Sequence, residues 1–234
     1  MDIRGFIDTS LVDWDGKIAA VVFTPGCNLR CIFCYNHELV LHPEGLEPVP
    51  EEEVFAFLRE HSDFIDGVCI TGGEPTLQED LPDFCRRIRA LGMGVKLDTN
   101  GTDPRALADL LEEGLLSYIA MDLKAPLREE CYTRVGGEEA RAFLPAIKRS
   151  VGLIMASGVP YEFRSTLVPG LHTREWVEEM AQDIRGADRY VLQRFRPYTT
   201  LDPGLKDLKP QTDEEMGALA GAARKYIAHT TWRG

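Results

Sequence analysis

The chain alternates short apolar runs with longer amphipathic stretches, and this alternation constrains the fold more than any other feature. The short runs have the composition of buried strands: residues 18–23, 67–70, 94–98, 118–122, 161–168 and 189–193. One amphipathic stretch follows each run and predicts a helix: residues 51–61, 79–91, 104–113, 138–157, 173–185 and 212–229. Strand and helix alternation implies parallel pairing with right-handed crossovers. We therefore predict an α/β fold whose sheet is either open and doubly wound or a barrel, complete or incomplete.

Length and composition indicate one ordinary globular domain over residues 1–234, with a lead-in over residues 1–17. The 234 residues are 44% hydrophobic, which is enough for one sizeable core. No apolar run approaches the roughly 20 residues of a membrane helix, and the first residues do not have the pattern of a signal peptide. These features predict a cytoplasmic protein.

The net charge argues against nucleic acid as a partner. The chain has 26 Lys and Arg against 38 Asp and Glu, a formal charge of −12. Phosphate backbones attract basic surfaces, and only a local basic groove would reverse this expectation.

Five of the six predicted strands end in distinctive loops. The first is followed by "TPGCNLRCIFCYN", and the next four by "TGGEP", "DTNG", "DLK" and "VPG". In α/β folds of this kind, function gathers at the carboxyl ends of the strands. The five loops are therefore predicted to lie on one rim and to form the functional site.

Cys27, Cys31 and Cys34 form a C-x3-C-x2-C pattern in the first loop. Thiolates select zinc or iron-sulfur clusters. A structural zinc would need a fourth ligand, and His37 is the nearest candidate. A 4Fe–4S cluster held by three thiolates would instead keep one iron open for chemistry. The other cysteines, Cys69, Cys85 and Cys131, are interpreted as buried apolar side chains.

The cysteine spacing, with Phe33 just before the third cysteine, resembles the signature of the radical S-adenosylmethionine (SAM) enzymes. The resemblance implies a partial (β/α)6 barrel of the TIM type, here over residues 18–229. It also implies a 4Fe–4S cluster on the three cysteines, whose open iron binds SAM. Reductive cleavage of SAM would then give methionine and a 5′-deoxyadenosyl radical.

The loop "TGGEP" is similar to the glycine-rich motif of that family, which meets the methionyl ammonium of SAM. Gly72 and Gly73 allow close backbone approach and unusual dihedral angles. Glu74 adds negative charge near an ammonium group. The resemblance therefore implies that these three residues bind the cofactor.

The loops "LDTNG" and "MDLK" are similar to those of the activases of glycyl-radical enzymes, a subgroup of the family. In this subgroup, matching residues hold a monovalent cation, Na⁺ or K⁺, beside the cofactor carboxylate. The resemblance assigns Asp98, Thr99 and Asp122 to the cation, with Asp98 also beside the cofactor. It assigns Lys124 to the cofactor or the substrate backbone.

Arg164 stands five residues before Pro169, as an arginine that contacts the cofactor does in the activases. An arginine in an apolar strand needs a carboxylate partner, so a structural ion pair is the alternative. The activases also have a ribose-contacting histidine near the sixth strand, whereas this chain has "LQRFRPY". Gln193 or Arg194 could take its place.

The opening of the chain, residues 3–36, resembles the anaerobic ribonucleoside-triphosphate reductase activating proteins, with departures at Asp15 and Tyr35. The similarity extends over most of the chain and is densest over residues 3–125. The implied partners are a glycyl-radical enzyme and an electron donor such as flavodoxin or ferredoxin. The implied reaction removes a hydrogen atom from the Cα of a glycine on the partner enzyme.

Three alternatives follow from the same residues. The chain could be a radical SAM enzyme for a small molecule, like the carboxydeazaguanine synthases, or one that modifies RNA or a protein side chain. The third is a zinc- or cluster-binding interaction module without catalysis.

Overall fold

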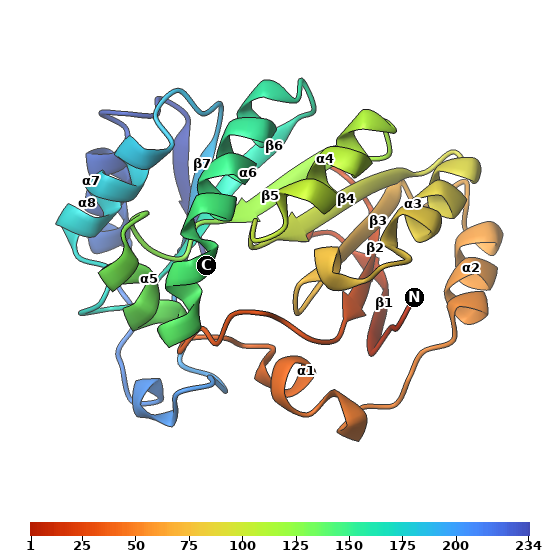
Figure 1. Cartoon of the computed structure of the whole chain (residues 1–234), viewed down its shortest axis with the longest axis horizontal. Coiled ribbons are helices and arrows are strands. Elements are labelled where there is room, and N and C mark those ends of the chain that lie inside the picture. The colour runs from red at the N-terminus through yellow and green to blue at the C-terminus, as the bar shows by residue number, and fades with distance from the viewer. The chain divides into compact units, whose positions relative to one another are not determined.

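The computed structural model describes all residues, 1–234, and contains eight strands and eight α-helices (Figure 1). The strands are β1 (Gly5–Ser10), β2 (Ala19–Thr24), β3 (Gly67–Gly72), β4 (Gly94–Thr99), β5 (Tyr118–Asp122), β6 (Tyr161–Leu167), β7 (Tyr190–Arg194) and β8 (Thr230–Arg233). The helices are α1 (His37–Leu41), α2 (Glu51–Glu60), α3 (Leu81–Ala90), α4 (Pro104–Glu112), α5 (Glu129–Gly136), α6 (Leu144–Ala156), α7 (Arg174–Asp183) and α8 (Asp213–Ala223).

All six predicted strands and all six predicted helices are present. The predicted strands are β2 to β7, and the predicted helices are α2, α3, α4, α6, α7 and α8. The sequence did not predict β1 and β8, nor the short helices α1 and α5. β1 lacks an apolar run, and its central residues are exposed. β8 has only four residues, so neither strand carries a clear hydrophobic pattern.

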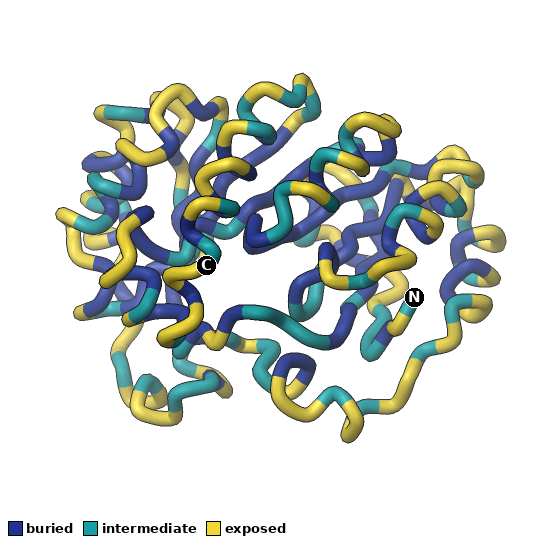
Figure 2. The backbone as a smooth tube through the Cα atoms, viewed as in Figure 1, coloured by how far each residue is buried: buried dark blue, intermediate teal, exposed yellow.

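The chain forms two compact units. Unit 1 comprises residues 1–27, 36–99 and 103–120. Its strands β2, β3 and β4 pair in parallel in chain order, and β1 pairs antiparallel with β2. Parallel strands flanked by helices are buried on both faces, and the central residues of β2 and β3 are indeed fully buried (Figure 2). Helices α2, α3 and α4 each bury one apolar stripe and leave the opposite side exposed.

Unit 2 comprises residues 28–35, 100–102 and 121–234. Its strands β6, β7 and β8 also pair in parallel in chain order. Helix α8 contacts α7, β7 and β8. A capping box fixes the start of α8, because Thr212 and Glu215 each accept the other's backbone N–H.

The two faces of β6 differ in chemistry. Phe163, Ser165 and Leu167 alternate onto one face, and the Ser165 hydroxyl lies 3.9 Å from the sulfur of Met180 in α7. Glu162 and Arg164 alternate onto the opposite face, because side chains in a strand have a period of two. Helix α7 therefore covers the first face, and the polar residues lie on the other one.

No helix combines the length and the hydropathy that a membrane crossing requires.

Candidate functional site

The cysteine loop begins in unit 1, against the loop that follows β3. The Gly73 N–H donates to Thr24 O at 2.8 Å, and the Glu74 N–H donates to Gly26 O at 2.8 Å. A Cβ on Gly73 would lie 1.8 Å from Gly26 O, so no larger residue fits there. Gly72 has a φ of +121°, which favours glycine. The glycine pair thus lets "TGGEP" pack directly on the backbone that leads into Cys27.

The second half of the cysteine loop belongs to unit 2, where main-chain hydrogen bonds hold it on two sides. The N–H groups of Arg30 and Ile32 donate to the last carbonyls of α5, each at 2.9 Å. On the other side, Ile32 O and Cys34 O accept from residues 202 and 201, at 2.8 Å and 3.2 Å. Cys31 is buried, whereas Cys27 and Cys34 are partly exposed.

Glu74 is 1% exposed, and its side chain joins two loops of unit 1. Its Oε1 accepts from the Thr76 N–H at 3.2 Å, from the Thr76 hydroxyl at 2.6 Å and from the Thr99 hydroxyl at 2.7 Å. A buried carboxylate requires such donors. Glu74 therefore fixes the end of β4 to the loop after β3, a role that the sequence did not predict.

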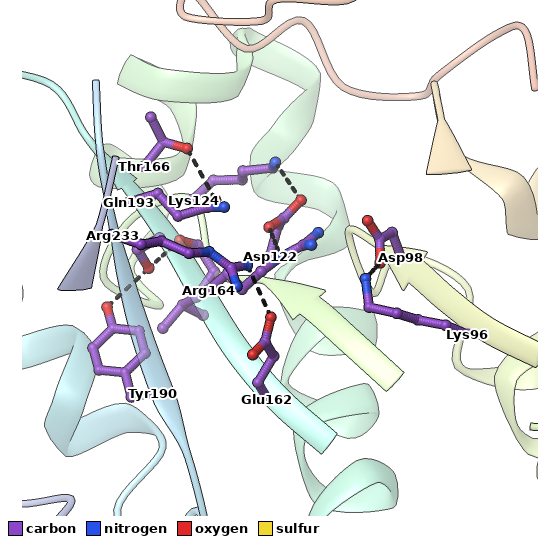
Figure 3. Close-up of polar contacts among 12 residues, drawn as sticks. Lys96, Asp98, Asp122, Lys124, Glu162, Arg164, Thr166, Tyr190, Gln193 and Arg233 are labelled. Carbon is purple, nitrogen blue, oxygen red and sulfur yellow. Dashed lines mark hydrogen bonds and ion pairs between the residues drawn. The ribbon is translucent and has the colours of Figure 1, made fainter. Parts of the chain in front are cut away.

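Asp98 lies near the end of β4 and forms an ion pair with Lys96 of the same strand (Figure 3). The two side chains are on one face of the strand, because they are two residues apart. Lys96 was missed by the sequence analysis, although a lysine inside an apolar run is the kind of signal that could have identified it.

Asp122, at the end of β5, forms ion pairs with two cations in unit 2. Arg164 Nε lies 3.0 Å from Asp122 Oδ1, and Lys124 Nζ lies 3.1 Å from Oδ2 (Figure 3). Burial alone would raise the pKa of Asp122, but the charges of Arg164 and Lys124 lower that pKa well below its usual range. The predicted carboxylate partner of Arg164 is thus present, and the three predicted residues of unit 2 form one cluster.

Lys124 is also close enough to Cys31 and Cys34 for their charges to affect it. Burial alone would lower the pKa of Lys124, but Asp122 raises that pKa above its usual value, and Cys31 and Cys34 act in the same direction. Lys124 therefore remains protonated and places a positive charge near two of the three predicted thiolate ligands.

His172 is a buried residue of the loop after β6 that the sequence analysis missed. Its Nδ1 accepts from the Val168 N–H at 3.0 Å, and its Nε2 is 2.9 Å from Lys124 O. The ring packs edge-on against Phe33, with centroids 5.7 Å apart. Burial lowers the pKa of His172 to about 4, so the imidazole is neutral near pH 7 and donates from Nε2. His172 thereby joins Phe33 of the cysteine loop to the backbone of "DLK".

Gln193 and Arg194, the candidates at the sixth predicted strand, lie on opposite faces of β7. Gln193 Oε1 is 3.5 Å from the Thr166 hydroxyl, on the polar face of β6 that also carries Arg164 (Figure 3). Arg194 instead pairs with Asp213 and stacks on Trp232. Of the two, only Gln193 shares a face with Arg164.

The remaining cysteines are buried, as predicted. Cys69 lies in β3 and Cys85 in α3, where burial raises the pKa of the Cys85 thiol to about 12. Cys131 lies in α5, a helix that the sequence did not predict. Cys131 and Val135, about one helical turn apart, are buried, but the eight residues of α5 are too few for a clear pattern.

The family model described as "Radical SAM superfamily" matches residues 21–184 of the chain. That segment includes the cysteine loop and every predicted site residue up to Arg164. The chain belongs to the radical SAM superfamily.

Two relatives match the radical SAM chain over almost its full length. One, from Methanocaldococcus jannaschii, is provisionally named a glycyl-radical enzyme activating enzyme; it is 34% identical over 99% of this chain and 95% of its own. The other is the pyruvate formate-lyase-activating enzyme of Clostridium pasteurianum, 29% identical over 96% of both chains. The chain is therefore similar in sequence and in length to activating enzymes.

Solved structures confirm the α/β fold of the superfamily. SuiB of Streptococcus suis matches 92% of the chain with a TM-score of 0.70 and 18% identity. SuiB bound to S-adenosylmethionine matches with a TM-score of 0.69 and 17% identity. The chain spans about half the length of SuiB, 48% and 52% in the two structures. At this identity the likeness concerns the fold alone.

Proposed function

We propose that the chain reductively cleaves SAM and uses the resulting 5′-deoxyadenosyl radical to install a glycyl radical on a partner enzyme, such as anaerobic ribonucleotide reductase. The observation that carries the proposal is the 34% identity to an activating enzyme over 99% of this chain and 95% of the relative.

The three cysteines fit a 4Fe–4S cluster by their donor chemistry. Cys31 and Cys34 are held by main-chain hydrogen bonds, and Lys124 places a positive charge near both. When bound, the cluster supplies the electron that cleaves SAM. His37 begins helix α1 in unit 1.

In this proposal, the chain's own residues bind and orient SAM. Arg164 and Lys124 offer positive charge to its carboxylate, and Glu74 offers negative charge to its ammonium group. Held in this way, the radical is directed at one C–H bond of the partner's glycine, away from water. The proposed cofactor-binding residues are Phe33, Gly72, Gly73, Glu74, Asp98, Lys124 and Arg164.

The first experiment tests the cluster and the cleavage. After reconstitution without oxygen, the protein is expected to bind about four irons per chain and, once reduced, to release 5′-deoxyadenosine from SAM. Cys31→Ala should lose both properties, whereas the control Cys85→Ala should keep them. Zinc instead of iron, or intact SAM with a reduced cluster, would contradict the proposal and favour an interaction module.

The second experiment tests the partner. The loaded protein, SAM and a low-potential donor such as flavodoxin or ferredoxin are incubated with a candidate glycyl-radical enzyme, anaerobic ribonucleotide reductase. A glycine-centred radical signal in electron paramagnetic resonance, with one 5′-deoxyadenosine formed per radical, is expected. Cleavage of SAM without that signal would favour a small-molecule or RNA substrate.

A further inference from the structure

Lys96 is almost completely buried in the middle of β4. Its side chain is 3% exposed, and its ammonium group pairs with the Asp98 carboxylate (Figure 3). Nζ also lies 3.6 Å from the sulfur of Cys69 in β3. A lysine is rarely buried to this extent unless it is paired, so the contact with Asp98 accounts for its position.

The pair results from local geometry within one unit. Residues 96 and 98 project from the same face of β4 because they are two positions apart in a strand. Cys69 is the register partner of Lys96 on β3, so β3 fixes the ammonium group from one side. The positive charge is therefore built into the sheet beside Asp98.

Asp122 also has protein cations as partners. Arg164 and Lys124 each contact one of its carboxylate oxygens, at 3.0 Å and 3.1 Å. Both carboxylates expected to hold a monovalent cation thus already face ammonium or guanidinium groups. Either carboxylate would therefore attract a further cation more weakly than an uncompensated carboxylate would. The donor set does not fit a resident Na⁺ or K⁺.

We propose that Lys96 is the counter-cation of Asp98, a positioning residue that takes the role of a monovalent metal ion, so that the reaction requires neither Na⁺ nor K⁺. The proposal rests on the SAM chemistry proposed above. Lys96 keeps the Asp98 side chain fixed in its rotamer and neutralised, without contacting the reacting atoms itself.

The first test measures cation binding to the wild-type protein. Thallium(I) serves as the probe for K⁺ in ²⁰⁵Tl nuclear magnetic resonance, and no saturable shift or broadening is expected. Replacing K⁺ by tetramethylammonium should change the rate of SAM cleavage by the loaded enzyme by less than about twofold. A saturable thallium site, or a loss of about tenfold or more in tetramethylammonium, would overturn the proposal.

The second test removes the ammonium group. Lys96→Gln leaves Asp98 without its lysine partner and is expected to create a saturable thallium site and a requirement for K⁺ in SAM cleavage. Lys96→Arg is the matched control, because it keeps the charge and should bind no thallium. A folded Lys96→Gln protein that binds no thallium would contradict the proposal, and if this variant does not fold, the wild-type measurement decides.

The two proposals can fail separately. Thallium binding is measured without SAM turnover, so its outcome does not depend on the reaction. A loaded enzyme that cleaves no SAM in any salt contradicts the proposed function, whereas a thallium site in the wild type contradicts only the role of Lys96.

Discussion

The two units neutralise their strand-end carboxylates in different ways. In unit 1, Asp98 has Lys96 of its own strand as its ion-pair partner. In unit 2, Asp122 has two partners, Lys124 from the following loop and Arg164 from β6. The Asp98 pair is the more deeply buried, with side chains 3% and 11% exposed against 10% to 24% in the Asp122 cluster, and Asp122 retains one cation when the other is removed. This difference predicts unequal costs for equivalent substitutions.

The largest effect is expected from Lys96→Met. Removing one partner of a buried ion pair is strongly destabilising, at a cost of about 4 kcal/mol in the free energy of unfolding. Trp14, the tryptophan of unit 1, reports on this unit in urea unfolding followed by fluorescence. The control is Lys17→Met, which breaks an exposed pair with Asp66 and should cost less than about 1 kcal/mol. Equal costs for the two variants would remove the basis of the comparison.

The next largest effect is the pH dependence of stability that His172 gives to unit 2. Its pKa is lowered to about 4, below the usual value near 6.5. The unfolded chain therefore takes up a proton that the folded chain excludes, and stability falls as pH decreases from about 6.5 to about 4, by about 3 kcal/mol at most.

The measurement is urea unfolding between pH 4 and pH 7. His172→Gln can keep both hydrogen bonds without titrating, so this dependence should disappear in that variant. His42→Gln removes an exposed imidazole and should leave the dependence in place. If the pH dependence of stability persists in His172→Gln, other titratable groups are its cause.

Arg164→Met and Lys124→Met test the paired cations of Asp122. Each variant retains one cation beside Asp122. The expected cost in the free energy of unfolding is about 2 kcal/mol for Arg164→Met and about 1 kcal/mol for Lys124→Met. The double variant should cost more than the sum of the two. The lowered pKa of Asp122 stabilises the fold above its usual pKa near 3.9, and this contribution is lost as pH falls below that value. In either single variant the folded-state pKa of Asp122 should lie closer to its usual value, so the contribution should be smaller and lost over a narrower range of pH. Additive costs would show that the two cations do not share Asp122.

Thr99→Val is expected to have the smallest effect. It removes the 2.7 Å hydrogen bond from the Thr99 hydroxyl to Glu74, while the two bonds from Thr76 remain. The expected cost is about 1 kcal/mol in the free energy of unfolding, measured by urea unfolding followed by Trp14 fluorescence. Thr9→Val, at an exposed position of β1, is the control. A cost near that of Lys96→Met would mean that Glu74 depends on Thr99 alone.

Local patterns explain which parts of the fold and site could be predicted. The buried parallel strands have continuous apolar runs, so β2 to β7 were predictable, whereas the edge strands β1 and β8 lack that signal. Asp122 and Lys124 were predictable because their motif is contiguous. The links through His172 and Glu74 depend on contacts with distant loops, as the separation of 139 positions between Phe33 and His172 illustrates. No spacing rule in one sequence encodes such a contact.

The way in which the cysteine loop is held has a consequence for how the sequence can change. Arg30 and Ile32 donate their N–H groups to carbonyls of α5, and the carbonyls of Ile32 and Cys34 accept from the N–H groups of residues 202 and 201. Every amino acid except proline offers both groups, so side chains between the cysteines can diverge during evolution while the loop keeps its path. A proline scan of residues 30 and 32 would therefore reveal more about this loop than an alanine scan.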